Sequence, residues 1–241
     1  MTLLPLLLAL FLTFPSRAAP SCGPDPGSVP DLRLALDTAP TAAVGSSGHP
    51  DLDPAAFQAQ GLRPEVLSLA LRAFQTAWQR GETRKKVLTV IDYSLPSSQK
   101  RLWVIDLASN RLLFHEYVAH GSGSGGDVAS KFSNRDGTHR SNLGLLKTAE
   151  TYQGKHGYSL KLDGLEPGWN DNARDRAIVM HAADYVGEAT VRSQGRLGRS
   201  WGCPALAPEV TRAVIDTIKG GSLIFGYYPD QGWLNGSKYL H

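Results

Sequence analysis

The spacing of apolar positions predicts a helix that begins near residue 63. In the stretch 63–82, apolar residues recur at intervals of four, three and four, which is typical of an amphipathic helix packed on a core. Pro64 suits the first turn of this helix and Gly81 its end. The repeating positions are Leu67, Leu71, Phe74 and Trp78.

Runs rich in β-branched residues predict strands after this helix. Residues 86–94 form one such run, and residues 101–121 are predicted to form a hairpin that turns near 108–110. A second helix is predicted over 208–219. Many strands with few helices indicate a β-rich α+β domain from about residue 63 to residue 230. Further short strands are predicted at 145–150, 158–162, 177–180 and 222–228.

A long polar segment rich in glycine, residues 121–142, interrupts this pattern. Loops of this length inside a domain are usually functional or mobile, so a lid over an active site is one hypothesis. Its glycines do not form a phosphate-binding loop, because no Gly-Lys-Ser/Thr sequence opens a helix there.

The N-terminus carries an apolar run of the length expected for an export signal, and we predict a signal peptide over 1–19. The run is short for a membrane span, which needs about 20 residues, although an uncleaved anchor remains an alternative. Residues 20–54 are rich in Pro, Gly, Ser and Ala, which predicts a flexible tail or linker. Cys22 lies in this tail, and its lipidation stays open because the residues before it match a lipoprotein box poorly.

Composition and charge exclude little beyond nucleic-acid binding. The 241 residues are 41% hydrophobic and 20% charged, as in a soluble domain with an N-terminal extension. The net charge is +3, and the longest basic run is Arg84-Lys85-Lys86, too small a basic surface to favour phosphate-backbone binding. The chain has two cysteines. We do not expect them to form a disulfide, which would tie the tail to the most distinctive motif.

That motif places Cys203 in a polar stretch, between Gly202 and Pro204, 22 positions after His181. A thiol attacks acyl carbons as the thiolate, so it needs a base within reach, and an imidazole can take its proton. Arg199 would favour the thiolate, and the amides of Gly202 and Cys203 would face a developing oxyanion. The alternative is a buried structural cysteine and a structural histidine. No recognised zinc-ligand spacing is present.

The stretch "HAADYV…GRLGRSWGCPAL" resembles the active-site signature of murein L,D-transpeptidases (the YkuD-like family), in the branch that carries "GRSWGCPA". That signature is a histidine, a variable segment and Ser/Thr-x-Gly-Cys. The resemblance extends over about 87–230 and includes "LFHEYVAHGSGSG" and "FSN". Trp201 stands where many members have a second histidine, Ala205 where many have Arg or Asn, and Ala182 where glycine is common. The signature maps onto His181, Ser200, Trp201, Gly202 and Cys203.

The resemblance implies a fold and a location. We expect an L,D-transpeptidase-like β-sandwich with a few flanking helices over 86–230, and a helical segment, 55–85, packed on it. Residues 231–241 are expected to be a C-terminal tail. The substrates of this family lie outside the cytoplasmic membrane, so the protein is expected in the periplasm or cell envelope, in agreement with the predicted export signal.

The resemblance also implies a reaction on peptidoglycan stem tetrapeptides. Cys203 would attack the carbonyl between diaminopimelate, or another diamino acid, and the terminal D-Ala, and a thioester would form. An amine on a second stem or on a lipoprotein would resolve it into a cross-link. Water as the acceptor would make the protein an L,D-carboxypeptidase instead. A non-catalytic cell-wall-binding protein is the alternative of another class.

Roles for single residues follow from the same resemblance. His181 would be the general base and then acid, often oriented in this family by a backbone carbonyl. The amides of Gly202 and Cys203, with Trp201, would stabilise the oxyanion, and Ser200 and Arg199 would adjoin the nucleophile. No metal or organic cofactor is expected, because thiol chemistry with an amide oxyanion hole is self-sufficient. The residues expected to line the cleft, with ordinary loop packing as the alternative, are Tyr152, His156 and His120.

Overall fold

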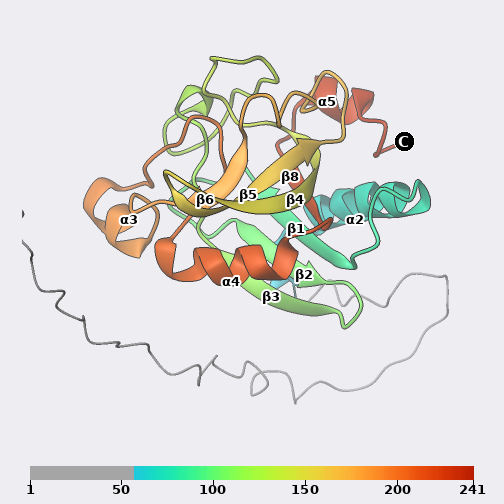
Figure 1. Ribbon diagram of the computed structural model, residues 1–241, viewed down its shortest axis with the longest axis horizontal. Helices are drawn as coiled ribbons and strands as arrows, with labels where there is room; N and C mark the ends of the chain where they lie inside the picture. The colour runs from blue at the N-terminus through green and yellow to red at the C-terminus, as the bar shows by residue number, and fades with distance from the viewer. Residues whose placement is uncertain (1–56) are drawn as a thin grey trace, which may run out of the picture. The chain divides into compact units, whose positions relative to one another are not determined.

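The computed structural model describes residues 57–241 (Figure 1). The predicted signal peptide, the predicted tail and Cys22 lie outside these residues. The predicted β-rich α+β class is confirmed, since the described residues form a curved, barrel-like sheet with a few helices around it. Its strands are β1 (Val87–Asp92), β2 (Leu102–Asp106), β3 (Arg111–Glu116), β4 (Gly144–Gly154), β5 (Gly157–Gly164), β6 (Val179–Ala182), β7 (Ala205–Leu206) and β8 (Leu223–Tyr227).

The strands form one mixed sheet in the order β3-β2-β1-β8-β4-β5-β6-β7. Most neighbours are antiparallel, whereas β1 pairs with β8 and β6 pairs with β7 in parallel. The last pairing matters for the site, because it sets His181 opposite Ala205 in the register. The helices are α2 (Pro64–Gln79), α3 (Glu188–Gln194), α4 (Pro208–Ile218) and α5 (Gln231–Gly236), and a short 3-10 helix, η2, covers Ser122–Ser124.

Helix α4 shows how far the sheet curves. It contacts β1 as well as β5 and β6, although β8 and β4 lie between β1 and β5 in the sheet order, so the sheet must bend around it. Figure 1 shows α4 across one face of β5 and β6, and α2 on the side of β1 and β8, which it contacts. Among residues 57–241, no helix combines the length and the apolar character that crossing a membrane requires.

Helix α2 forms where the pattern places a helix, but it buries a different stripe. Leu67 is buried as expected, whereas Leu71, Phe74 and Trp78 are half-buried at the edge of the contact. Small side chains occupy the centre of the contact, because alanine allows the helix backbone to lie close to the sheet. The buried residues are Val66, Leu67, Ala70, Ala73 and Ala77.

The structure differs from the predicted tail at residues 231–241. These residues form helix α5 and pack against the main core, with Trp233, Tyr239 and Leu240 buried. The indole N–H of Trp233 donates to Glu166 Oε2 at 3.1 Å, so this contact is polar as well as apolar. Sequence analysis missed the segment because eleven residues are too few to show a clear helical period. It also missed α3 and β7, which are seven and two residues long.

Candidate active site

The parallel pairing of β6 with β7 brings Cys203 beside the strand that carries His181. Cys203 lies two residues before Ala205, the partner of His181. Its sulfur accepts the N–H of Val179 at 3.5 Å and donates to the carbonyl of Ala177 at 3.6 Å. Val179 and His181 are two residues apart on one strand, so their side chains share a face of the sheet. The thiol therefore lies against the backbone of β6, two residues along the strand from His181.

A backbone carbonyl sets the orientation and tautomer of His181. The ring is buried, and Nδ1 lies 2.8 Å from the carbonyl oxygen of Ala182. Only an N–H can bond to a carbonyl, so Nδ1 carries the proton and Nε2 is left with a lone pair. Burial lowers the pKa of His181; the Ala182 carbonyl opposes this, and the charges of His156 and Lys155 add to it. The side chain is therefore a neutral base at pH 7.

Burial also keeps the Cys203 thiol neutral. Desolvation raises its pKa above the ordinary 9.0, although the Val179 N–H, Arg176, its own amide and Lys155 act in the opposite direction. Sequence analysis expected Arg199 in this role, but the Arg199 guanidinium donates to the carbonyl of Gly125 at 2.9 Å. Arg176 and Lys155 were not singled out, because only the fold brings them close to the nucleophile.

Ser200 holds the backbone around Cys203, the predicted nucleophile, in residues 200–203, which we call the nucleophile loop. Its hydroxyl accepts the N–H of Gly202 at 3.1 Å and donates to the carbonyl of Cys203 at 2.6 Å. The Gly202 amide, expected to face the oxyanion, is therefore already engaged. The Cys203 amide lies beside its own sulfur, where it can meet a developing oxyanion. Gly202 has φ +120°, and a Cβ there would lie 2.8 Å from the Arg140 carbonyl oxygen, so only glycine fits.

The polar segment 121–142 supports this loop from the side. The Ser122 N–H donates to the Ser200 carbonyl at 2.7 Å, and Ser141 Oγ donates to the Gly202 carbonyl at 3.1 Å. Gly121 packs so closely that a Cβ would lie 2.8 Å from Gly202 Cα. These contacts give the segment a supporting role. That it also acts as a lid stays a hypothesis.

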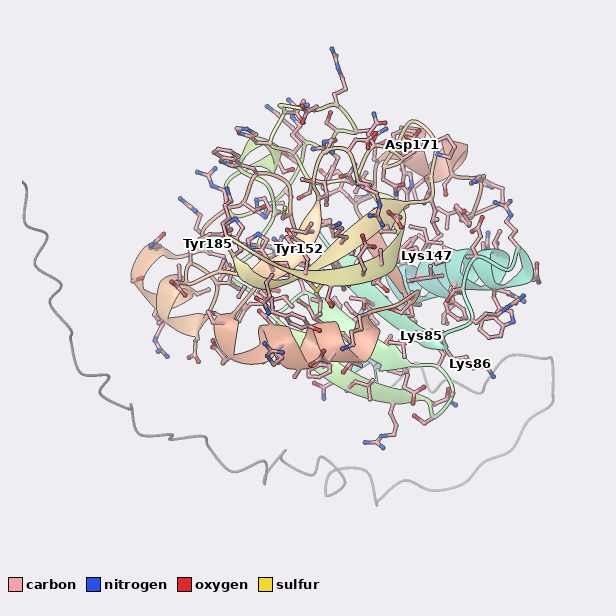
Figure 2. All side chains as sticks on the ribbon, in the orientation of Figure 1. Lys85, Lys86, Lys147, Tyr152, Asp171 and Tyr185 are labelled. Atoms are coloured by element: carbon pink, nitrogen blue, oxygen red, sulfur yellow. The ribbon has the colours of Figure 1, made fainter. Side chains whose placement is uncertain are left out.

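Of the three residues expected to line the cleft, the structure brings His156 to the catalytic pair. Its ring stacks on that of His181, with centroids 4.3 Å apart and an interplanar angle of 25°. His120 is fully buried beneath the loop, where Nδ1 lies 2.7 Å from Nη2 of Arg101. Tyr152, near the hairpin end of β4, packs under the ammonium of Lys161 at 5.6 Å (Figure 2).

Trp201 forms an exposed aromatic rim beside the nucleophile. Its side chain is 70% exposed, and the ring of His139 stacks on it with centroids 4.6 Å apart. The ammonium of Lys155 lies 5.8 Å from the centre of the same ring. Lys155 and His156 form the turn of the β4–β5 hairpin, between the paired residues Gly154 and Gly157. The sequence signal that could have predicted this hairpin is its two-residue turn flanked by glycines.

Among the described residues, no cluster suited to a metal ion adds to this site, and a surface hollow lies apart from it. Within residues 57–241, no group of three or more His, Cys, Asp or Glu side chains is arranged to hold a metal ion. A surface hollow of about 410 Å³ is lined by Lys85, Lys147 and the Gly220–Gly221 corner among others. It lies along the first half of β4, where Figure 2 labels Lys147, whereas His156, which stacks on His181, lies in the turn that follows β4.

Comparisons with known proteins place the chain in a family. The profile of the L,D-transpeptidase catalytic domain matches residues 58–227. No curated protein matches significantly. Among solved structures, an L,D-transpeptidase from Mycobacterium smegmatis is 15% identical, with a TM-score of 0.38 and 59% of each chain covered. One from Stackebrandtia nassauensis is 16% identical, with a TM-score of 0.36, covering 74% of this chain and 77% of that one.

The chain spans 59% of the length of the first structures it matches, including an L,D-transpeptidase solved in complex with imipenem, at 14% identity and a TM-score of 0.37. At such identities and TM-scores these structures carry no detail over to this site. The profile match is different, because it spans most of the described domain and contains both His181 and Cys203. The chain therefore belongs to the L,D-transpeptidase catalytic-domain family.

Proposed function

We propose that the protein is an exported peptidoglycan L,D-transpeptidase that uses Cys203 as its nucleophile and His181 as its base. One observation carries this proposal: a half-buried thiol lies beside the strand of a histidine whose Nδ1–H is fixed on the Ala182 carbonyl. This arrangement leaves Nε2 as the only basic position of the ring. The family match supports peptidoglycan stem peptides as the substrate class, and the donor that we propose is a tetrapeptide that ends in a diamino acid and D-Ala.

Acylation begins with both catalytic groups neutral. His181 Nε2 takes the thiol proton as the sulfur attacks the carbonyl between the diamino acid and D-Ala. Negative charge develops on the carbonyl oxygen, and the Cys203 amide is placed to stabilise it. The carbon–nitrogen bond then breaks, and the imidazolium returns its proton to the leaving amine. D-Ala departs, and the diamino acid is held as a thioester on Cys203.

Deacylation repeats these steps in reverse with a new nucleophile. An amine of a second stem, or of a lipoprotein, attacks the thioester, and His181 takes a proton from it. The carbon–sulfur bond breaks, the proton returns to the sulfur, and an amide cross-link is formed. Water at this step would release a shortened stem instead. The export signal agrees with this assignment, because the stems lie outside the cytoplasmic membrane.

The test is intact-protein mass spectrometry after incubation with a disaccharide-tetrapeptide, with wild type and Cys203→Ala side by side. We expect an acyl adduct in the wild type only, mapped to the Cys203 peptide so that Cys22 is excluded, together with dimeric product. Matching circular dichroism and melting curves would show that the variant folds. Shortened stem alone would indicate a carboxypeptidase, and neither adduct nor product would favour a non-catalytic wall-binding protein.

A further inference from the structure

Cationic side chains act on both Cys203 and His181. Arg176 and Lys155 are the charged side chains that act on the Cys203 thiol, and Lys155 and His156 act on His181. A site that gathers positive charge around its nucleophile is complementary to an anionic substrate.

Arg176 is already occupied by the protein. Its guanidinium donates to the carbonyls of Ser133 and Arg140 at 2.6 and 2.7 Å, and to Asn142 Oδ1 at 2.9 Å. These bonds tie the segment 121–142 to the site, so they give Arg176 a structural use and limit its reach toward a substrate.

Lys155 is different, because it is held at the site without an anionic partner. Among residues 57–241 it takes part in no ion pair. The hairpin turn positions it: Gly157, with φ +73°, closes the turn, and the neighbouring His156 stacks on His181. Its ammonium lies 5.8 Å from the centre of the exposed Trp201 ring, two residues from the nucleophile. Lys155 is exposed, and an ammonium with free donors is suited to bind a carboxylate.

We propose that Lys155 and Trp201 form a carboxylate subsite for the donor stem, with Lys155 as its anion-binding residue and Trp201 as its apolar floor. This inference rests on the proposed function for the identity of the donor. A stem tetrapeptide offers two carboxylates near the scissile bond, that of the terminal D-Ala and the free one of diaminopimelate. Both present the same chemistry to an ammonium, so the subsite is assigned to a carboxylate and the two sources are separated by experiment.

The kinetic test compares wild type with Lys155→Ala, Lys155→Arg and the matched control Lys161→Ala. Lys161 lies on the same hairpin, but it pairs with Glu150 at 3.0 Å. We expect Lys155→Ala to raise KM for the tetrapeptide donor about tenfold, the loss of a hydrogen bond to a charged group, with kcat little changed. Lys155→Arg should restore most of the affinity, and Lys161→Ala should behave as wild type. Equal KM values for wild type and Lys155→Ala would overturn the proposal.

Two amidated donors identify the carboxylate. One carries a C-terminal carboxamide on D-Ala, and the other carries an amidated diaminopimelate. The donor that lacks the bound carboxylate should show a raised KM with wild type and no further rise with Lys155→Ala, because the contact is already absent. If Lys155→Ala weakens both amidated donors as strongly as the parent, the subsite does not bind a carboxylate and the proposal fails.

A second test does not depend on transpeptidase activity. Iodoacetate and iodoacetamide both alkylate a thiolate with loss of iodide, but only the first is an anion. The ratio of their rates at Cys203, followed by mass spectrometry of its peptide, should fall roughly threefold in Lys155→Ala and stay constant in Lys161→Ala. An unchanged ratio would contradict an anion-binding Lys155. A changed ratio in a protein that turns over no donor would preserve the subsite and reject the proposed function.

Discussion

At the scale of single residues, the proposed catalytic pair, Cys203 and His181, rests as two neutral groups. Burial raises the pKa of Cys203 and lowers that of His181, so each shift opposes a thiolate–imidazolium pair in the free protein. The proton therefore moves when the substrate arrives, and its transfer belongs to the attack itself. The pH dependence of activity should reveal this arrangement.

Removing His156 should move the acid limb of the pH profile. In the proposed mechanism the base form of His181 is needed for acylation, so kcat/KM should fall as the pH drops through its pKa, which lies below the ordinary 6.5. His156→Asn exposes the stacked face of His181 to water and removes a neighbouring charge that lowers its pKa. Both changes raise the pKa, so the acid limb should shift to higher pH. The control His139→Asn removes a ring stacked on Trp201 and should leave the limb in place. Identical profiles would show that His156 does not act on His181.

Two glycines of the segment 121–142 provide a second test at this scale. A Cβ at Gly121 would lie 2.3 Å from the carbonyl oxygen of His139 and 2.8 Å from Gly202 Cα, whereas a Cβ at Gly126 would meet nothing within 4 Å. Gly121→Ala should reduce the free energy of unfolding by about 1–3 kcal/mol and slow acylation, because it displaces the nucleophile loop. Gly126→Ala should leave both quantities near wild type. Urea unfolding and acylation rates measure them, and equal effects of the two substitutions would contradict the packing described.

The site was predictable where local sequence determines chemistry. Cys203 and His181 were singled out from their motif, and the structure places Cys203 two residues before β7, beside the strand β6 that carries His181. The use of the Gly202 amide was not predictable, because it depends on the orientation of one hydroxyl, that of Ser200. Lys155 and Arg176 were missed for another reason. The sheet order and the hairpin turn bring them near Cys203, and no local sequence pattern predicts that proximity.

At the scale of elements, strands with strong periodicity were predicted well and short segments were not. The hairpin of β2 and β3 and helix α4 lie where the pattern places them, because β2 and α4 bury apolar side chains at regular spacing and β3 pairs with β2 across a short turn. Helix α5 gave no such signal. It is held by one large side chain, Trp233, which packs against Phe225 with ring centroids 5.6 Å apart. An element that depends on a single anchor has no period to detect.

A pair of tryptophans tests whether the C-terminal segment belongs to the domain. Trp233 is fully buried and bonds to Glu166, whereas Trp201 is 70% exposed. Trp233→Ala should lower the free energy of unfolding by about 3–5 kcal/mol, from the cavity and from the lost partner of a buried carboxylate. Trp201→Ala should change it by less than about 0.5 kcal/mol. Denaturant unfolding of both variants provides the measurement, and a small effect at Trp233 would return residues 231–241 to the status of a tail.

At the scale of the whole molecule, a buried cation couples the stability of the domain to pH. Arg101 is fully buried and donates to the carbonyls of Val118 and Leu95, and its Nη2 lies 2.7 Å from Nδ1 of His120. Guanidinium nitrogens only donate, so Nδ1 must accept, which requires a neutral imidazole. Burial and the charge of Arg101 together lower the pKa of His120 to about 4. The pair lies under the nucleophile loop, since the Ser200 N–H donates to the His120 carbonyl.

This coupling predicts a loss of stability in mild acid. An unfolded chain protonates His120 near pH 6.5, but the folded protein does not until about pH 4. The stability that the neutral side chain contributes is complete above pH 6.5 and is lost as the pH falls toward 4, by about 2–3 kcal/mol at pH 4.5. His120→Asn keeps an acceptor for Arg101 and removes the titration, so its free energy of unfolding should fall less between pH 7 and pH 4.5. The pKa of His181 is lowered as well. In His120→Asn the free energy of unfolding should therefore still fall with decreasing pH, but less steeply than in the wild type. The exposed His241→Asn is the control, and it should retain the full wild-type slope. Parallel slopes for wild type and His120→Asn would mean that Arg101 tolerates a protonated neighbour and that acid sensitivity arises elsewhere in the fold.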